Sequence, residues 1–462
     1  MKYKIAIIFL FASSTLFGQN NIQRIDSLLI SLYKKGRING NVLIADKDQI
    51  IYSKSFGFAN EATKEKLTEN SVFDLASVSK QFTALGIMLL KEKGILNLDE
   101  PFSTYIPELS SYKGITVKHL LNHTGGLPDY MDIFNKTFDK TKIATNNDII
   151  AHFSKEKPKV LFVPNSRWEY SNTGYALLAS IIERVSGLKY RDFMTKHIFK
   201  PLEMSNTFVQ NGNNPLPNIK NLAYSYAFSD SLKKLVLTDE LKEYNDQKML
   251  SGVVGDGGIF SNVIDLLKWD RALYDNRLIS TAVKKEMFKP AILANGSTFE
   301  YGYGFQLDSS KVFGKIISHT GGWGGYLTLN ELHVNSGKTI IILFNHESSE
   351  IINKSIRYTL YGLQEPNPTG KKEITLTPEQ LNKVVGAYKI QEGMEFFITL
   401  KGGVPYASMT NQTPLRIYPV SDTLFFLKEF DATILFEKDE KRNIYKLTFS
   451  QGKGKMEAKR IK

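Results

Sequence analysis

The sequence predicts an α/β domain followed by a smaller all-β domain. Three observations indicate this fold class. Strand-like runs occur near the N-terminus and again before the last quarter of the chain, and the segment between them repeats apolar residues at helical spacing. Beyond Leu376, short alternating runs recur between turn residues, as in a small β-barrel or sandwich. Strands therefore flank a helical insertion in the first domain, and a second domain follows.

The first domain is expected to open with an antiparallel hairpin. Two strand-like runs, 41–45 and 49–56, are separated by residues 46–48, Asp-Lys-Asp, which have a turn composition. From Ser77 the pattern changes to helical spacing and continues to Gly94, which has the type and position of a helix C-terminal cap. The later elements are expected in this order: helices at 178–187 and 263–274, strands at 312–319, 326–334 and 339–345, and a helix at 351–363.

The two ends of the chain have their own patterns. Lys2 and Lys4 precede a short apolar run and small residues, so we predict that residues 1–18 form a cleaved secretory signal. That run is shorter than the ~20 residues of a membrane-spanning helix, and no later segment is long and apolar enough, so the mature protein is expected to be soluble. Proline and glycine interrupt the pattern near the other end, where we assign residues 366–374 as a linker and 375–462 as the β domain.

The role of the β domain is open at this stage. Its aromatic residues are expected to fill a barrel interior, with ligand binding or the covering of a cleft in the first domain as alternatives. Five residues are the candidates: Phe396, Phe397, Tyr406, Phe425 and Phe426.

The composition of the 462 residues excludes several classes of protein. Cysteine is absent, so disulfides, thiolate metal sites and a lipidated N-terminal cysteine are impossible. The formal charge is +12, but lysines are spread along the chain without the block of like charges that a nucleic-acid-binding arm carries. We expect no nucleic-acid partner and an ordinary solvated surface, with attraction to anionic envelope polymers or membranes as the alternative.

Ser77-Val78-Ser79-Lys80 offers a nucleophile with a base. Residues three apart on a helix share a face, so Lys80 can approach the Ser77 hydroxyl. Only Ser77 follows an extended stretch, residues 73–76, and opens the most apolar helix, where main-chain N–H groups and the helix dipole favour a developing anion. The same spacing recurs without that setting at Ser31/Lys34, Ser110/Lys113, Ser154/Lys157, Ser186/Lys189, Ser231/Lys234 and Ser450/Lys453.

Two further motifs have a structural as well as a catalytic interpretation. Tyr-Ser-Asn at 170–172 precedes a helix that its last two residues could cap, and another Tyr-x-Asn occurs at 274–276. His-Thr-Gly occurs at 123–125, in a loop after a helix, and at 319–321, after a β-like run. Only their order relative to the Ser-x-x-Lys motif separates the two interpretations.

In chain order, three motifs resemble those of the serine β-lactamase and penicillin-binding-protein superfamily: Ser77-x-x-Lys80, Tyr170-x-Asn172 and His319-Thr320-Gly321. The resemblance is closest to class C β-lactamases, D-alanyl-D-alanine carboxypeptidases and related esterases, and it covers residues 22–365. Segments 120–128 and 255–258 and Trp269 also look like parts of this family. The resemblance implies an antiparallel sheet with flanking helices beside an all-helical subdomain, with the active site between them.

The resemblance also implies a role for each matched residue. Ser77 would be the nucleophile, and Lys80 and Tyr170 would move its proton and that of the leaving group, in a division that stays open. A basic role for Lys80 requires burial or nearby positive charge to lower its pKa. Asn172 would hydrogen-bond the substrate, and the main-chain N–H groups of Ser77 and Gly322 would form the oxyanion hole. The other implied substrate-binding residues lie in the third motif: His319, Thr320, Gly321 and Gly322.

The residue at position 319 bears on the substrate. Many β-lactamases and carboxypeptidases have Lys there, which supports recognition of a carboxylate, whereas a histidine with an unperturbed pKa of ~6.5 is mostly neutral at pH 7. We therefore expect an exported enzyme, periplasmic or secreted, that acts on an ester or a D-amino-acid-containing peptide amide. The substrate is a small molecule or a peptide, with peptidoglycan fragments among the candidates.

Three alternatives remain at this stage. A β-lactamase would use the same motifs, and a non-catalytic receptor of the same fold would capture cell-wall peptides without turnover. For a metal hydrolase, His119 and His123 are four residues apart, but the His-Glu-x-x-His pattern is absent and Gly125-Gly126 indicates that the helix has ended. We therefore expect neither a metal nor a cofactor.

Overall fold

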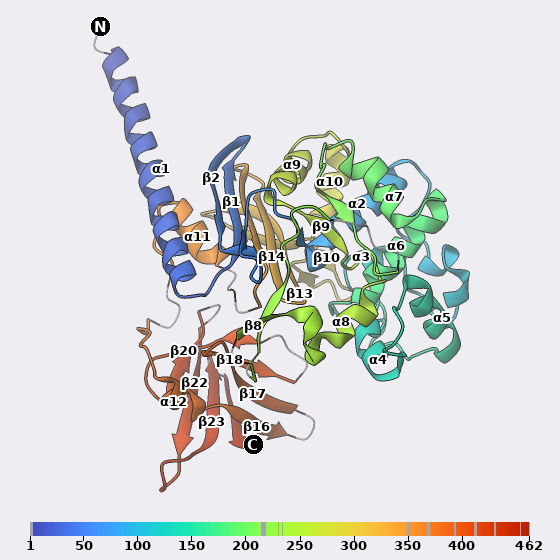
Figure 1. Cartoon of the computed structure of the whole chain (residues 1–462). Helices are drawn as coiled ribbons and strands as arrows, with labels where there is room; N and C mark the ends of the chain where they lie inside the picture. Colours follow the sequence, from blue (N-terminus) through green and yellow to red (C-terminus); the bar gives the residue numbers. More distant parts are fainter. Residues whose placement is uncertain are drawn as a thin grey trace. The chain divides into compact units, whose positions relative to one another are not determined.

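The computed structural model separates the chain into two compact units, residues 1–360 and 361–462, each described here by itself (Figure 1). The residues that it describes are 3–213, 219–229, 231–232, 234–347, 349, 352–366, 370–391, 394–410, 414–428, 431–452 and 454–461. The boundary lies a few residues before the linker assigned from the sequence, and residues 367–369 of that linker are outside the described residues.

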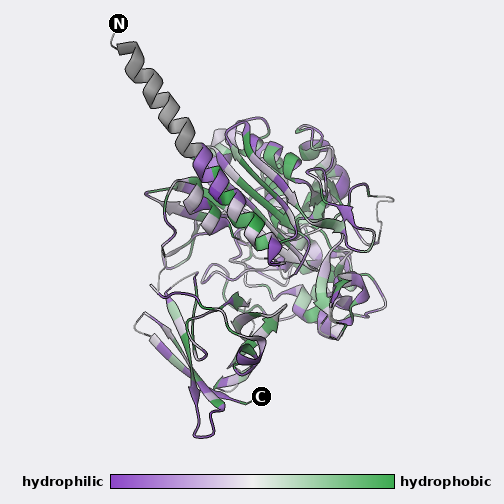
Figure 2. Cartoon of the chain, turned by 60° about the vertical axis from the view of Figure 1, so that its left-hand side comes forward, coloured by the Kyte–Doolittle hydropathy of each residue, from purple (hydrophilic) through white to green (hydrophobic). Residues whose placement is uncertain are grey.

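The main sheet of the first unit is antiparallel, with the strand order β12-β13-β14-β15-β1-β2. The predicted N-terminal hairpin is confirmed as β1 and β2. β1 also pairs with β15 from near the end of the unit, so one sheet joins the strands that precede and follow the helical insertion in the sequence. Apolar residues gather along these strands (Figure 2). The bounds are β1 Gly40–Asp46, β2 Gln49–Phe56, β12 Gln306–Ser310, β13 Gly314–Trp323, β14 Tyr326–His333 and β15 Lys338–Phe344.

Helices cover the main sheet on both sides. α1 and α11, which contact each other, lie to the left of the sheet in Figure 1, and α9, which contacts β1 and β15, lies to its right. α9 spans Val263–Tyr274, the range predicted from the sequence. The bounds of the helices in this layer are α1 Tyr3–Lys34, α9 Val263–Tyr274, α10 Thr281–Met287 and α11 Asn353–Leu360.

The helical part of the first unit is built around α6. Ser171 caps its N-terminus by accepting a hydrogen bond from the Gly174 amide, and Gly187, in the left-handed conformation with φ 69°, ends it where the sequence predicted. The residues of α6 from Thr173 to Ile182 are all buried against neighbouring helices. The bounds are α2 Ser79–Glu92, α3 Val117–Leu121, α4 Tyr130–Thr137, α5 Asn146–Glu156, α6 Asn172–Ser186, α7 Tyr190–Met194 and α8 Asn245–Leu250.

Short strands connect the two parts of this unit. β9 pairs with β5 on one side and β6 on the other, which ties the chain just before Ser77 to the segment after α8. The bounds are β3 Phe58–Asn60, β4 Glu65–Lys66, β5 Phe73–Asp74, β6 Phe208–Val209, β7 Tyr226–Ser229, β8 Lys234–Leu237, β9 Ile259–Ser261, β10 Ala291–Ile292 and β11 Thr298–Phe299.

The predicted signal segment lies in α1, which runs without a break from Tyr3 to Lys34. The second half of α1 packs into the fold through Ile25, Leu29 and Leu32, which are buried. Among the residues that the structure describes, no helix has both the length and the apolar character needed to cross a membrane. Removal of residues 1–18 stays a prediction.

The second unit is a near-closed antiparallel barrel, with the strand order β19-β18-β17-β16-β24-β23-β22-β21-β20. β19 and β20 stand at opposite ends of this order, yet only buried Ile417 separates them in sequence, so the two edges of the sheet come together. The bounds are α12 Pro378–Asn382, β16 Gly386–Gln391, β17 Met394–Lys401, β18 Val404–Met409, β19 Leu415–Arg416, β20 Tyr418–Pro419, β21 Leu424–Phe426, β22 Ala432–Lys438, β23 Ile444–Gln451 and β24 Gly454–Arg460.

The candidate aromatic residues of the barrel divide into three groups. Phe396 and Phe425 are buried in the barrel core, as expected, whereas Phe426 is buried outside that core and Phe397 and Tyr406 are only partly buried. Phe396 and Phe425 belong to an apolar core that includes Leu381, Val384, Tyr388, Ile434 and Leu447.

Candidate active site

A strained turn presents Ser77. It lies in a 3₁₀ turn, η1, of residues Ala76–Val78, immediately before α2 rather than in the first turn of the helix itself. Ala76 has φ 47°, a left-handed conformation that a non-glycine residue adopts at a cost. The Asp74 carboxylate accepts a hydrogen bond from the Ala76 amide at 2.8 Å and holds this turn. Ser77 is left half-buried, with its side chain accessible to a ligand.

Lys80 lies one turn further on and is fully buried. Its Nζ atom donates to Ser77 Oγ at 3.1 Å, to Asn172 Oδ1 at 2.9 Å and to the main-chain oxygen of Asp256 at 2.8 Å. Three acceptors match the three N–H bonds of an ammonium group. If Lys80 loses a proton, its lone pair can accept the Ser77 proton across the same contact. The structure thus brings Ser77, Lys80 and Asn172 together in one hydrogen-bonded group.

Tyr170 stands beside this group. The centre of its ring is 4.8 Å from Lys80 Nζ and 6.2 Å from the centre of the His319 ring. Its hydroxyl oxygen is buried and has no hydrogen-bond partner among the described residues. The phenol is therefore close to the serine–lysine pair without being bonded to either residue.

The third motif lies within β13, which continues through it to Trp323 instead of ending at His319 as the sequence pattern suggested. His319 and Gly321 are buried, whereas Thr320 and Gly322 are exposed, which is the alternation of a strand. A Cβ atom on Gly321 would lie 2.3 Å from the main-chain oxygen of Leu75, so only glycine lets β13 approach the turn before Ser77 this closely.

His319 is held as a neutral ring. Its Nδ1–H donates to the main-chain oxygen of Thr320 at 2.6 Å, so its Nε2 accepts the Tyr301 hydroxyl proton at 2.9 Å. Burial, helped by the charge of Lys80, lowers the pKa of His319 to about 3. At neutral pH this side chain therefore offers no positive charge to a substrate carboxylate.

A pocket of about 480 Å³ opens over the reactive residues. Ser77 and Gly322, the two residues implied as oxyanion donors, both line it, together with Tyr170 and Asn172. The remaining walls come from five segments: residues 74–76, 130–131, 210–212, 250–260 and Trp323. Four of the eight matched residues thus line one cavity, and Lys80 is bonded to two of these four, Ser77 and Asn172, whereas His319, Thr320 and Gly321 are not among the residues that line it.

Sequence reasoning assigned no role to several acidic residues of this site. Asp129 accepts from both the main-chain and side-chain nitrogens of Asn172, at 2.9 and 3.1 Å, and Asp256 accepts the Tyr130 hydroxyl at 2.9 Å. Burial raises the pKa of Asp129 and of Asp256, and the nearby Lys80 charge opposes that rise in both. The sequence indicates no more for the Gly255-Asp256-Gly257-Gly258 segment than a likeness to the family, whereas the structure shows that Gly255 and Gly258 adopt positive φ, 105° and 81°.

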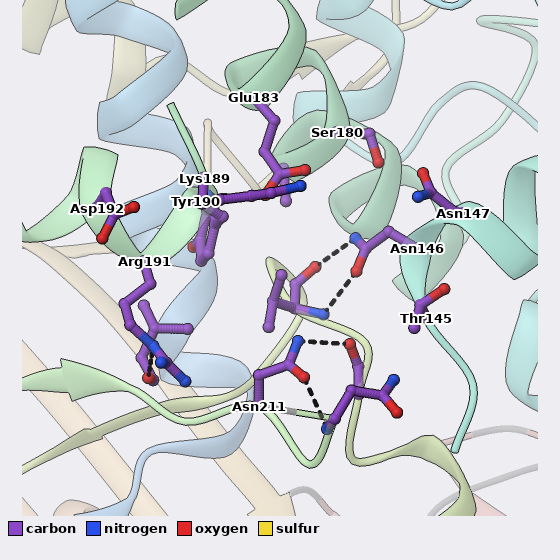
Figure 3. Close-up of a pocket in the computed structure, with 15 residues that line it drawn as sticks. Thr145, Asn146, Asn147, Ser180, Glu183, Lys189, Tyr190, Arg191, Asp192 and Asn211 are labelled. Atoms are coloured by element: carbon purple, nitrogen blue, oxygen red, sulfur yellow. Dashed lines mark hydrogen bonds between the residues drawn. The ribbon is translucent and has the colours of Figure 1, made fainter. Parts of the chain in front are cut away.

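A second pocket, of about 330 Å³, lies beside the helical part (Figure 3). Asn146 bonds both main-chain groups of Val254, at 2.8 and 3.0 Å, and Asn211 donates to the main-chain oxygen of Gly252 at 2.8 Å, as the dashed lines show. The two pockets share a wall of two segments, 210–213 and 250–254. Over 210–213 and 251–254, successive residues line opposite pockets: Gln210, Gly212, Ser251 and Val253 line the active-site pocket, as does Leu250, and Asn211, Asn213, Gly252 and Val254 line the second pocket.

An antiparallel sheet beside a helical part, with a serine–lysine pair where they meet, defines a protein of the penicillin-binding-protein superfamily. The chain belongs to the beta-lactamase family, whose model matches residues 23–358. The resemblance inferred from the three motifs and the predicted fold class are thereby confirmed.

Individual relatives agree with this assignment. The chain is 40% identical to penicillin-binding protein 4* of Bacillus subtilis over 429 residues, which cover 91% of this chain and 95% of that protein. Among solved structures, the D-amino acid amidase from Ochrobactrum anthropi is similar at 25% identity with a TM-score of 0.59, over 74% of this chain and 97% of the amidase. The octameric penicillin-binding protein homologue from Pyrococcus abyssi shares the fold at 22% identity with a TM-score of 0.62, over 94% of this chain and 99% of that one.

Proposed function

We propose that this protein is a serine hydrolase that cleaves an ester or a D-amino-acid-containing amide through an acyl-enzyme on Ser77. The observation that carries the proposal is the 3.1 Å contact between Lys80 Nζ and Ser77 Oγ at the floor of an open pocket. A serine hydroxyl is a weak nucleophile until a neighbouring base accepts its proton. The buried amine is the group in position to do so.

The reaction follows from this geometry. From the state in which Lys80 is a neutral amine, Ser77 Oγ attacks the substrate carbonyl carbon while its proton passes to the lone pair of Lys80 Nζ, with Tyr170 as the second proton carrier beside it. The tetrahedral intermediate then breaks its bond to the leaving alcohol or amine, which takes up that proton. Water attacks the acyl-serine ester and releases the acid and free Ser77. The main-chain N–H groups of Ser77 and Gly322 are the proposed oxyanion donors, each worth about 3 kcal/mol in the transition state.

The state of His319 supports the choice of substrate. Because both ring nitrogens are already bonded within the protein and the ring is neutral, a substrate carboxylate gains no cation at this position. Esters and amides that have no carboxylate at this position do not need such a cation for binding. The similarity to a D-amino acid amidase agrees with this preference.

The 40% identical relative named as a penicillin-binding protein favours a second candidate. In that case Ser77 would be acylated by β-lactams or cell-wall peptides, either with turnover, as in a β-lactamase, or without it, as in a receptor. The two candidates share the nucleophile and differ in substrate and in the fate of the acyl-enzyme.

One panel of substrates separates these possibilities. The full chain, its Ser77→Ala variant and Ser186→Ala are assayed with p-nitrophenyl esters, D-amino-acid amides, muropeptides and β-lactams. Ser186 belongs to another Ser-x-x-Lys sequence, so its variant controls for removal of a serine hydroxyl and should keep wild-type turnover. We expect turnover of esters or D-amino-acid amides that Ser77→Ala abolishes. Faster turnover of cephalosporins, or an acyl-enzyme that never releases product, would contradict the proposal.

We also propose that the protein acts outside the cytoplasm, in the periplasm or the medium, after removal of residues 1–18. The charged start and short apolar run of the N-terminus support this. N-terminal sequencing of the protein recovered from its host should find Gln19 as the first residue. An intact N-terminus on the cytoplasmic protein would contradict it.

A further inference from the structure

His123 belongs to the first of the two His-Thr-Gly sequences, to which the proposed reaction gives no part. Its side chain is 1% exposed, and its backbone is left-handed, with φ 61°. Non-glycine residues adopt this conformation rarely, and they keep it only where the surrounding structure enforces it. The hydrogen bond from the Thr124 amide to the His119 oxygen, at 2.9 Å, follows from this sharp turn of the chain.

Two hydrogen bonds join His123 to the residues on either side of Tyr170. The main-chain oxygen of His123 accepts from the Glu169 amide at 3.0 Å, and its ring Nδ1 accepts from the Ser171 amide at 3.1 Å. The His123 ring also packs on the Tyr170 ring, with 4.4 Å between centres and 38° between planes. One residue therefore fixes the backbone before and after Tyr170 and supports its ring.

The state of the His123 ring keeps this arrangement intact at neutral pH. Burial, together with the charge of Lys80, lowers the pKa of His123 well below its usual value. The other titratable groups that face the ring are the phenols of Tyr170, Tyr175 and Tyr301. A neutral ring whose Nδ1 accepts must carry its proton on Nε2, so the Ser171 amide always finds an acceptor.

We propose that His123 is a positioning residue that sets where the Tyr170 phenol stands relative to Ser77 and Lys80. The proposal rests on the proposed function, because it gives Tyr170 a part in moving the serine proton. The Tyr170 hydroxyl has no hydrogen bond in the described part of the chain, so the supports for its position are its backbone and its ring contacts. Displacement of a catalytic group by about 1 Å lowers a rate about 100-fold.

Three variants of the full chain test this role. His123→Gly keeps the left-handed backbone but removes the ring and the acceptor for the Ser171 amide. His123→Asn also tolerates that backbone and places Oδ1 as many bonds from Cα as Nδ1, so the acceptor is retained. His119→Asn is the matched control, because His119 also accepts a main-chain amide, that of Thr116 at 3.2 Å, but does so in a helix cap.

The measured quantity is the rate at which a fluorescent phosphonate labels Ser77, per folded molecule counted by a denaturant titration. We expect His123→Gly to be labelled about 100-fold more slowly than the wild type, His123→Asn to recover most of that rate, and His119→Asn to match the wild type. A folded His123→Gly labelled as fast as the wild type, or a His123→Asn as slow as His123→Gly, overturns the positioning role. A wild type that is labelled but turns over nothing in the substrate panel overturns the proposed function alone, and one left unlabelled overturns both.

Discussion

Replacement of Gly321 by alanine tests how closely β13 must approach the turn that presents Ser77. The added Cβ would lie 2.3 Å from the Leu75 oxygen and 2.3 Å from Thr328 Oγ1, whereas ordinary contact begins at 3.4 Å. The strand and the turn must therefore separate by about 1 Å. Because Leu75 is two residues before Ser77 and Gly322 directly follows Gly321, that separation moves the two proposed oxyanion donors apart.

The expected losses follow from this displacement. Overpacking of this kind costs about 1–3 kcal/mol of unfolding free energy, and a shift of about 1 Å in a catalytic group costs about 100-fold in rate. Denaturant titration measures the first and phosphonate labelling of Ser77 measures the second. Gly322→Ala is the stability control, because the nearest atom to its Cβ, Leu327 Cδ2, is 3.7 Å away. A Gly321→Ala protein with wild-type stability and labelling rate would refute the reasoning.

Three further predictions concern the fold. Burial raises the pKa of Asp74 from 3.8 to about 7, so the folded protein holds a proton that the unfolded chain releases, and unfolding free energy falls as pH rises from about 4 to 7. In denaturant titrations at pH 4 and 8, Asp74→Asn should remove the contribution of Asp74 to this pH dependence, which is on the order of 4 kcal/mol. An unchanged pH dependence would contradict the assignment. Arg357 donates from Nε and Nη2 to buried Glu331, at 3.0 and 2.7 Å, so Arg357→Met should lower the unfolding free energy by about 3–5 kcal/mol. Adding Glu331→Gln to that variant should restore part of the loss, because it removes the charge left without its partner. Equal stability of the single and the double variant would exclude an unpaired charge as the cause. Residues 361–462 have their own apolar core, so this segment expressed alone should unfold in one cooperative denaturant transition, and a gradual change without a transition would show that it needs the rest of the chain.

Local signals in the sequence account for the elements that were predicted well. The bounds of α9 and the end of α6 at Gly187 follow from apolar spacing and a glycine that can adopt positive φ, both of which act within a few residues. The approach of Lys80 to Ser77 is likewise local, because both lie within one turn of chain. Spacing therefore predicts that the two side chains meet, whereas the choice of Ser77 among the seven Ser-x-x-Lys sequences depends on the extended stretch before it and the apolar helix after it.

The remaining parts of the site depend on contacts between distant segments. The Asp256 oxygen that accepts from Lys80 is 176 residues away, and the hydroxyl that bonds to His319 Nε2 comes from Tyr301 on another segment. The spacing of apolar residues along the chain does not predict hydrogen bonds between segments this far apart in the sequence. The link from His123 to the amide after Tyr170 spans 48 residues and could be suspected only from the repeated His-Thr-Gly sequence.

The wall of alternating residues between the two pockets has a consequence for changing the substrate range. Because Gly212 and Ser251 face the active site while their neighbours Asn211 and Gly252 face the other cavity, the backbone between them cannot move toward one side without receding from the other. A set of variants in which only the residues lining the active-site pocket are changed leaves the other residues of this wall, which line the second pocket, unchanged. Paired randomisation of adjacent positions lets the partition shift as a unit, and residues that line only the second pocket then help to determine which ligands the first pocket accepts.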